Sequence, residues 1–411
     1  MNNLDSAHAR MNDIISRGQA SAAALLEQVH TQVPQDRLVR GRTLGFRYAA
    51  PNTLNGTLPE VIDLADAQGL TEDDGTPKII AACLDQDTPV AEPDPDWVPP
   101  LLVDVANQTS ERLHKNALSQ IAGRAGVPTK YMRELVESQN PELRALAIRI
   151  LETHFKKTER EDTRYLSRSV DGEMRGFLSD RYRRLDSRPL LDKFAQHCQE
   201  IGAVPVDGTF SDTRVALKAY IPRILEPIPG EPMLIGLEWG NSDFGCGSHT
   251  LRVALLRLWC RNGCTFEDAI RNIHLGRRLD DDIAFSRETY DLDTKAAASA
   301  MGDIIHHHLS PEQIEKSMAA IAAAHETTIS RTSFAATIKK ALSKSDAAKV
   351  LDAYDNDTDV EHLPSVMGTA WRASNAVSWI AGTKDGDQKL HMHRLAGKIL
   401  TQYTSAPTKA A

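Results

Sequence analysis

Arginines interleaved with aromatic residues carry the most distinctive chemistry in this sequence. Residues 160–188 hold eight bases against six acids, with Tyr165, Phe177 and Tyr182 among them. Guanidinium groups beside aromatic rings suit single-stranded nucleic acid, which proteins hold by phosphate contacts and base stacking. The predicted contacts are Arg168, Arg175, Arg181, Tyr182, Arg183 and Arg184. The alternative is that Asp180 and Asp186 pair with these arginines and fix the end of a strand.

A second basic segment, residues 245–278, has six arginines against two acids, a net charge of +4. Arg252, Arg257 and Arg261 are expected to support the nucleic-acid contact. If residues 265–278 are helical, Arg277 and Arg278 fall near the C-terminus of that helix. The helix dipole favours cations there, so these two arginines need no ligand.

The same segment contains zinc-ligand types, Cys246-x2-His249 and Cys260-x3-Cys264. Thiolates and imidazoles bind zinc tetrahedrally. Eleven extended residues separate His249 from Cys260, about 35 Å at the rise of a strand, so the two pairs do not meet. We therefore predict no metal site and no cofactor, and buried free cysteines instead.

Two further clusters have ordinary explanations. Three consecutive histidines, 306–308, point in three directions on a helix and do not jointly bind one ion. The acids 280–282 are typical of a turn or helix N-terminus, with a metal-dependent nuclease as the third functional alternative. The sequence shows no nucleophile–base pairing, phosphate-binding glycine loop or HExxH motif, which favours a protein that is not an enzyme without excluding one.

Residues 117–137, ALSQIAGRAGVPTKYMRELVE, follow the pattern of a helix-turn-helix around Gly126. Thr129, Lys130 and Arg133 would begin its recognition helix. A plain helical hairpin gives the same pattern, because a small residue at the turn simply permits close packing.

Charge is distributed unevenly along the chain. The net charge is −8, yet residues 60–96 alone hold eleven acids against Lys78, so the rest sums to +2. This uneven distribution has two interpretations: the acidic tract is a solvated surface loop, or it is a segment that mimics DNA. In the second case the chain would be an interaction or anti-defence protein that occupies a partner's basic groove.

Composition indicates a globular protein. The chain has 411 residues, 41% hydrophobic and 25% charged. No apolar run reaches the roughly 18–20 residues of a membrane span, and the N-terminus lacks the features of a signal peptide. Five cysteines without framework spacing fit a reducing compartment. We expect a cytoplasmic protein without a membrane partner; its oligomeric state, a homo-oligomer included, stays open.

The elements that must position the arginines are strands in the middle of the chain. Residues 163–170 and 173–180 are predicted to form a hairpin through Asp171-Gly172, which supplies the positive φ angles of a type I′ turn. Strand alternation past Asp180 would place Arg181 and Arg183 on one face, with Tyr182 and Arg184 on the other. Period-two patterns also predict strands over 213–221, 231–239 and 251–259, and helical patterns cover 1–32, 107–155, 189–201 and the chain after 265.

These patterns predict an α+β fold, a central antiparallel sheet with helices on one face and a helical C-terminal region. The expected divisions are 1–104, an N-terminal region with the acidic Pro/Gly-rich segment, 105–264, an α+β core, and 265–411, the helical region. Pro-induced breaks are expected at Gly126-Val127-Pro128 and Asn140-Pro141.

Several segments together resemble the phage/plasmid-like proteins of domain-of-unknown-function family nine hundred and thirty-two. The similar stretches are LSQIAGRAGVPTKYM (118–132), MRGFLSDRYRRLDSRPLL (174–191), LRVALLRLWCRNG (251–263) and MGTAWRASNAVSWIAG (367–382). The resemblance covers about 105–400 and includes Cys260 but neither Cys246 nor Cys264. It implies residence on phages, plasmids or other mobile elements, without an established activity. The outline of the core is similar to Rad-type single-strand annealing proteins, which is an analogy of fold alone.

The sequence thus predicts a nucleic-acid-binding protein of a phage or mobile element, which binds or anneals single-stranded DNA in recombination. The acidic mimic and the nuclease are the alternatives.

Overall fold

A computed structural model of the chain describes residues 3–49, 98–105, 109–158, 160–258, 263–272, 285–356, 368–384 and 386–404. The chain divides into two compact units. The large unit comprises Met1–Leu38, Leu166–Asp171 and Arg175–Ala411, and the small unit comprises Val39–Tyr165 and Gly172–Met174. These boundaries differ from the expected divisions at 104 and 264, because the N-terminal helix packs with the later strands rather than with the segment that follows it. The acidic tract 60–96, Cys260, Arg261 and the acids 280–282 lie outside the described residues.

In its described residues, the small unit combines short strands with three α-helices. Its elements are β2 (Leu44–Tyr48), β3 (Leu101–Val105), β4 (Thr109–Leu113), α2 (Lys115–Arg124), α3 (Thr129–Val136) and α4 (Pro141–Lys156), with the short 3-10 helix η1 (Gly41–Thr43). Strands β2, β3 and β4 are antiparallel, and β4 runs parallel to Glu173 and Met174 at the start of β6. The helix breaks predicted near Gly126 and Asn140 are confirmed, since Gly126 has φ 71° and the Asn140 side chain caps α4.

The predicted hairpin is present as β5 (Arg164–Val170) and β6 (Glu173–Ser179). Asp171 has φ 50° and Gly172 has φ 71°, the pair of positive angles that a type I′ turn requires. Strand β6 ends at Ser179, and a turn follows. The predicted alternation of side chains through Arg181–Arg184 is therefore wrong, because no strand carries it.

The large unit is built on an antiparallel sheet with the strand order β12-β11-β10-β8-β7, and β9 pairs with β10. The strands are β7 (Val204–Phe210), β8 (Val215–Tyr220), β9 (Leu225–Ile228), β10 (Glu231–Asn241), β11 (His249–Arg257) and β12 (Gly263–Asn272). The boundary between the two units along the chain falls within β1 (Gln35–Arg40). The predicted α+β class and antiparallel sheet are confirmed, with β8, β10 and β11 near their expected positions.

Strand β12 is a correction, because we expected a helix from Thr265 onward. Residues 263–272 instead pair with β11, from Leu256↔Gly263 to His249↔Asn272. A buried strand such as β11 leaves a row of backbone donors and acceptors at its edge that must be paired. Strand β12 satisfies them, and this pairing outweighs the weak helical pattern of the segment.

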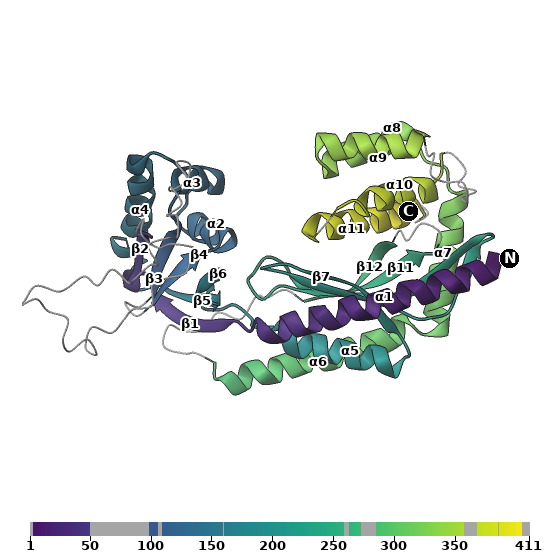
Figure 1. The fold of residues 1–411 in the computed structure, drawn as a ribbon, viewed down its shortest axis with the longest axis horizontal. Coiled ribbons are helices and arrows are strands. Elements are labelled where there is room, and N and C mark those ends of the chain that lie inside the picture. The colour runs from purple at the N-terminus through teal and green to yellow at the C-terminus, as the bar shows by residue number, and fades with distance from the viewer. Residues whose placement is uncertain are drawn as a thin grey trace, which may run out of the picture. The chain divides into compact units, whose positions relative to one another are not determined.

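Helices lie on both faces of this sheet. Leu217, Leu237 and Val253 share a core with α5 (Ser187–Glu200) and α6 (Arg287–His308). Figure 1 shows α5 and α6 on one side of the sheet and α10 (Ala370–Ala381) and α11 (Gly386–Thr404) on the other. The sequence predicted coverage of one face; the C-terminal helices add the second.

The long helix α1 (Asn3–Thr31) lies along β7. Its Gly18 allows this contact, because a Cβ at that position would lie 2.3 Å from the backbone oxygen of Val206. The expected helical C-terminal region is confirmed. In addition to α6, α10 and α11, it contains α7 (Pro311–Glu326), α8 (Arg331–Ala341) and α9 (Lys344–Asn356). Within the described part of the chain, no helix has the length and apolarity to cross a membrane.

Candidate functional site

The predicted contact Arg168 lies in the interior of the large unit, with 1% of its surface exposed. Its guanidinium contacts Asp36 at 2.7 Å and Asp186 at 2.6 Å, and it donates to the backbone oxygen of Asp243 at 2.8 Å. Tyr182 is also buried, and its hydroxyl donates to the backbone oxygen of Ser242. Burial raises the pKa of Tyr182. Neither side chain is placed to meet a phosphate or stack on a base.

The other predicted arginines of the described chain, apart from Arg181, also have partners within the large unit. The partners are Gln32 for Arg175, Asp293 for Arg183, Asp36 and the Tyr290 ring for Arg184, Glu238 for Arg252, and Glu231 with the Trp371 ring for Arg257. Arg181 is exposed, and Arg261 lies outside the described residues. The sequence pattern overstated the exposed basic surface, because acids distant in sequence pair with these guanidinium groups.

Asp243 gives the Arg168 cluster a pH dependence. Burial raises the pKa of Asp243 to about 6, against the opposing effects of Arg168 and of the hydrogen bonds from Ser187. An acid with a raised pKa in the folded state holds its proton more tightly when folded. Its contribution to stability is therefore complete below its ordinary pKa of 3.8 and is lost as the pH rises toward 6.

We expect Asp243→Asn to remove this dependence. The free energy of unfolding of the wild type, minus that of the variant, should fall between pH 4 and 6 by on the order of 1 kcal/mol per pH unit. Asparagine keeps a side-chain oxygen for the Ser187 donors, which favours a folded variant. Urea unfolding across this pH range measures the difference, and a constant difference would contradict the assignment.

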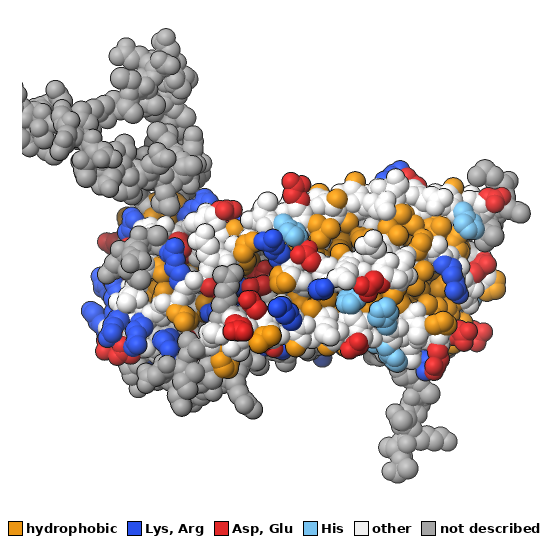
Figure 2. Space-filling model, turned by 90° about the horizontal axis from the view of Figure 1, so that it is seen from below, with side chains coloured by type: hydrophobic (Ala, Val, Ile, Leu, Met, Phe, Trp, Pro, Cys, Tyr) orange, Lys and Arg blue, Asp and Glu red, His pale blue; other side chains and the backbone are white. Residues whose placement is uncertain are grey.

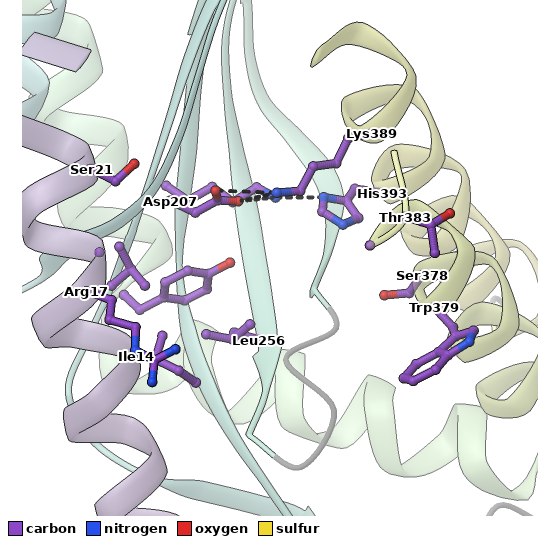
Figure 3. A pocket seen from close by; sticks show the side chains of 15 residues that line it. Ile14, Arg17, Ser21, Asp207, Leu256, Ser378, Trp379, Thr383, Lys389 and His393 are labelled. Atoms are coloured by element: carbon purple, nitrogen blue, oxygen red, sulfur yellow. Dashed lines mark hydrogen bonds and ion pairs between the residues drawn. The ribbon is translucent and has the colours of Figure 1, made fainter. Parts of the chain in front are cut away.

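A pocket of about 540 Å³ lies against the opposite face of the large sheet from α5 and α6. Its walls come from α1, from β7, β8 and β11, and from α10 and α11. Figure 3 shows charged side chains gathered at one end, where Asp207, Lys389 and His393 lie close together. Ile14, Leu256 and Trp379 lie toward the other end, with Arg17 beside Ile14. The pocket thus has a charged end and an apolar end.

The charged end rests on a row of residues that are directly opposite one another across the sheet. The register pairs Asp207 with Lys218, Lys218 with Glu238, Glu238 with Arg252, and Arg252 with Asp268. The signs alternate along the whole row, as expected for stabilising cross-strand pairs. Lys218 and Glu238 are buried in the interior, where a charge needs such partners.

Lys218 links this row to α11. Its Nζ donates to Nδ1 of His393 at 2.7 Å and lies 3.7 Å from a carboxylate oxygen of both Asp207 and Glu238. Burial, together with Lys218 and Lys389, holds the pKa of His393 well below its ordinary value. An imidazole with a lowered pKa suits this contact, because the Nδ1 of a neutral ring accepts the hydrogen bond that the Lys218 ammonium donates.

Glu238 lies below the pocket and is completely buried. Its carboxylate lies 3.6 Å from Arg394 and 3.7 Å from both Lys218 and Arg252. Arg394 follows His393 on α11, so the same carboxylate joins α11 to two strands. This ionic cluster positions Lys218 under the pocket.

The described side chains give no support to a zinc site at the cysteines. His249 pairs with Asn272 in the register, while Cys264 pairs with Leu255, six residues further along β11, which is about 20 Å. Cys198 is buried, and burial raises the pKa of its thiol to about 12. A different group of possible metal ligands lies on α5 and α6, and none of its residues lines the pocket.

None of the charged residues that line the pocket was predicted from the sequence. A signal was present, because Lys218 and Glu238 interrupt the apolar strands VALKAY and EPMLIGLEWGN. A charge in a strand that is otherwise apolar is buried only with a partner, and so marks a cluster of charges or a site.

Comparisons with known proteins identify no relative of this chain: no family model, no curated protein and no solved structure matches it.

Proposed function

We propose that the large unit binds a nucleotide in this pocket, with the phosphate at the charged end and the base at the apolar end. The observation that carries the proposal is the charge balance of the lining. Lys218 and Lys389 line the charged end with a single acid, Asp207, whereas the third cation of the lining, Arg17, lies beside Ile14 and forms an ion pair with Asp13. A pocket with several cations and one carboxylate favours an anionic ligand.

The ionic cluster beneath the pocket also has a positive net charge. Glu238 is shared among Lys218, Arg252 and Arg394, so it does not cancel the lysine charge that faces the cavity. Among the described side chains of this cluster, the four cations Lys218, Lys389, Arg252 and Arg394 exceed the two carboxylates of Asp207 and Glu238 by two. A bound phosphate group would complete the balance.

The apolar end supports a planar ring. Trp379 is a large aromatic side chain with 38% of its surface exposed, and it lines the pocket together with Leu256 and Ile14. Aromatic faces stack on nucleobases, with a contribution of about 1–3 kcal/mol per base. Phosphate and base are the two chemical groups that this combination of charged and apolar ends suits.

Lys218 is suited to binding rather than to nucleophilic catalysis. A nucleophilic lysine must be uncharged, in an apolar or cationic environment. Lys218 instead lies 3.7 Å from a carboxylate oxygen of both Asp207 and Glu238 and donates to His393, so its surroundings are neither apolar nor cationic. We therefore assign it the role of a fixed cation that holds the phosphate.

The nucleotide has two sources, free in solution or within a single strand of DNA or RNA. Binding of a strand would fit the residence on phages or plasmids that the family resemblance implies, although that resemblance implies no activity. Exposed Arg181 remains the described member of the predicted arginine set that is available to a strand. If the ligand is a free nucleotide, the chain is a nucleotide-binding protein; if the ligand is part of a strand, it is a nucleic-acid-binding protein.

Titration with AMP, adenosine and inorganic phosphate tests the proposal. We expect AMP to bind at least about tenfold more tightly than adenosine or phosphate, because each of these lacks one end of the ligand. Trp379→Ala should weaken AMP by about 5-fold or more and leave phosphate unchanged. Equal binding of AMP and adenosine, or no effect of Trp379→Ala, would overturn the assignment.

Competition between AMP and an oligonucleotide distinguishes a free nucleotide from a strand as the ligand. A short single-stranded oligonucleotide that displaces AMP, and binds more weakly as salt rises, identifies the strand as the ligand. AMP binding that the oligonucleotide does not affect identifies the free nucleotide.

A further inference from the structure

Two neighbouring helices of the large unit bring together side chains that bind transition metals. His197 and Glu200 lie on α5, and His306 lies on α6. One ligand atom from each residue lies within 4.8 Å of the others. Figure 2, which views the molecule from the side of α6, shows histidine side chains gathered at this surface. The group is separate from the pocket, because none of its members lines it.

The distances suit a single ion. Oε2 of Glu200 lies 2.9 Å from Nδ1 of His197 and 3.9 Å from Nε2 of His306. In a tetrahedral zinc site with bonds of about 2.0–2.1 Å, neighbouring ligand atoms are about 3.3 Å apart. The two observed distances bracket this value, so small side-chain rotations would close the site around an ion.

The backbone prepares the site on both helices. His197 and Glu200 are three residues apart on α5, a spacing that places them on one face. On α6, Gly302 lies one turn before His306, and a Cβ on Gly302 would lie 2.5 Å from Cε1 and Nε2 of His197. The absence of a side chain at 302 therefore makes room for the His197 ring between the helices and directs its Nδ1 toward Glu200.

We propose that His197, Glu200 and His306 form a binding site for Zn²⁺ or a chemically similar divalent ion, which links α5 to α6. Two imidazoles and one carboxylate are borderline ligands that zinc prefers, whereas Mg²⁺ and Ca²⁺ prefer oxygen alone. Three protein ligands leave a fourth position for water. Glu200 and His306 are 44% and 54% exposed, so an ion reaches the site from solvent.

The neighbouring histidines provide a matched control. His306, His307 and His308 are consecutive on α6, yet only His306 belongs to the group. From the sequence we predicted that the three do not bind one ion together, a prediction that concerned this helix alone and no ligand from a second helix. His307 is exposed, so His307→Ala changes the same tract without removing a ligand.

Zinc titration of the tag-free full chain, by calorimetry and thermal denaturation, tests the site. We expect one equivalent of Zn²⁺ to bind and raise the melting temperature, and EDTA to reverse the rise. His306→Ala and Glu200→Gln should each weaken binding by at least about tenfold, whereas His307→Ala should not. Circular dichroism of these surface variants should match the wild type.

Cobalt distinguishes this site from the cysteines. Co²⁺ in place of Zn²⁺ should show absorption typical of tetrahedral nitrogen and oxygen ligands, without thiolate-to-metal charge transfer. No binding by the wild type, undiminished binding by His306→Ala, or a thiolate band would each overturn the proposal.

Discussion

Replacing Glu238 with glutamine is expected to lower the free energy of unfolding by about 3–5 kcal/mol. The Glu238 carboxylate is completely buried and lies within 3.7 Å of Lys218, Arg252 and Arg394. Glutamine keeps the shape of the side chain but removes its charge, so three cations lose their shared anion in the interior. Chemical denaturation followed by circular dichroism measures the loss.

Two further variants show whether charge is the cause. Glu315→Gln, on an exposed turn of α7, should change stability by less than about 0.5 kcal/mol. The double variant Glu238→Gln with Lys218→Met should recover part of the loss, because it removes one of the unpaired cations. If the two substitutions are additive, the ionic cluster does not act as a unit and this explanation is wrong.

Replacing Arg168 with methionine is the second change with a large expected effect, again about 3–5 kcal/mol of unfolding free energy. Arg168 is 1% exposed and contacts Asp36 and Asp186, and Asp243 lies beside it. In this variant Asp36 keeps its ion pair with Arg184, whereas Asp186 loses its ion pair with residue 168. Without the guanidinium, the pKa of Asp243 should rise further, because Arg168 is the main influence that lowers it.

Arg181→Met is the matched control for this prediction. Arg181 is exposed, so its replacement should leave stability within about 0.5 kcal/mol of the wild type. Both Arg168 and Arg181 were predicted from the sequence to contact nucleic acid, but only Arg168 is buried. Comparing the two variants therefore distinguishes a loss of nucleic-acid contact from a loss of stability. A stable Arg168→Met variant that binds oligonucleotides less tightly would restore Arg168 as a nucleic-acid contact.

Local patterns in the sequence predicted much of the fold. Asp171-Gly172 specified its own hairpin turn, and Gly126 and Pro141 marked the helix boundaries, because each of these signals acts within a few residues. Strand β12 was mistaken for a helix because its conformation depends on pairing with β11. A sequence pattern does not show which strand lies beside it.

The site was much less predictable for the same reason. The hydrogen bond between Lys218 and His393 joins residues 175 positions apart, and Arg168 meets Asp36 across 132 positions. Arginines that look like an exposed basic face in the sequence become buried partners of distant acids. The row from Asp207 to Arg252 emerges only when the register of β7, β8, β10 and β11 is known.

The buried ionic cluster around Glu238 both stabilises the large unit and positions a residue of the pocket. Glu238 contacts β8, β11 and α11 through Lys218, Arg252 and Arg394, and so fixes the lysine that borders the pocket. Buried ion pairs add little net stability but are costly to break. We infer that this cluster serves to position Lys218, in keeping with the binding role proposed for the pocket.

The most direct test of the pocket is a calorimetric titration of AMP into the wild type, Lys389→Gln and Lys398→Gln. Lys389 lines the charged end and its side chain is 28% exposed, so its loss should not prevent folding. Lys398 lies on the same helix, is exposed and does not line the pocket. We predict that Lys389→Gln weakens AMP binding by about 10- to 100-fold, the effect of one charged hydrogen bond, and that Lys398→Gln leaves it unchanged. Equal affinity in all three proteins, or no binding to the wild type, would contradict nucleotide binding at this site.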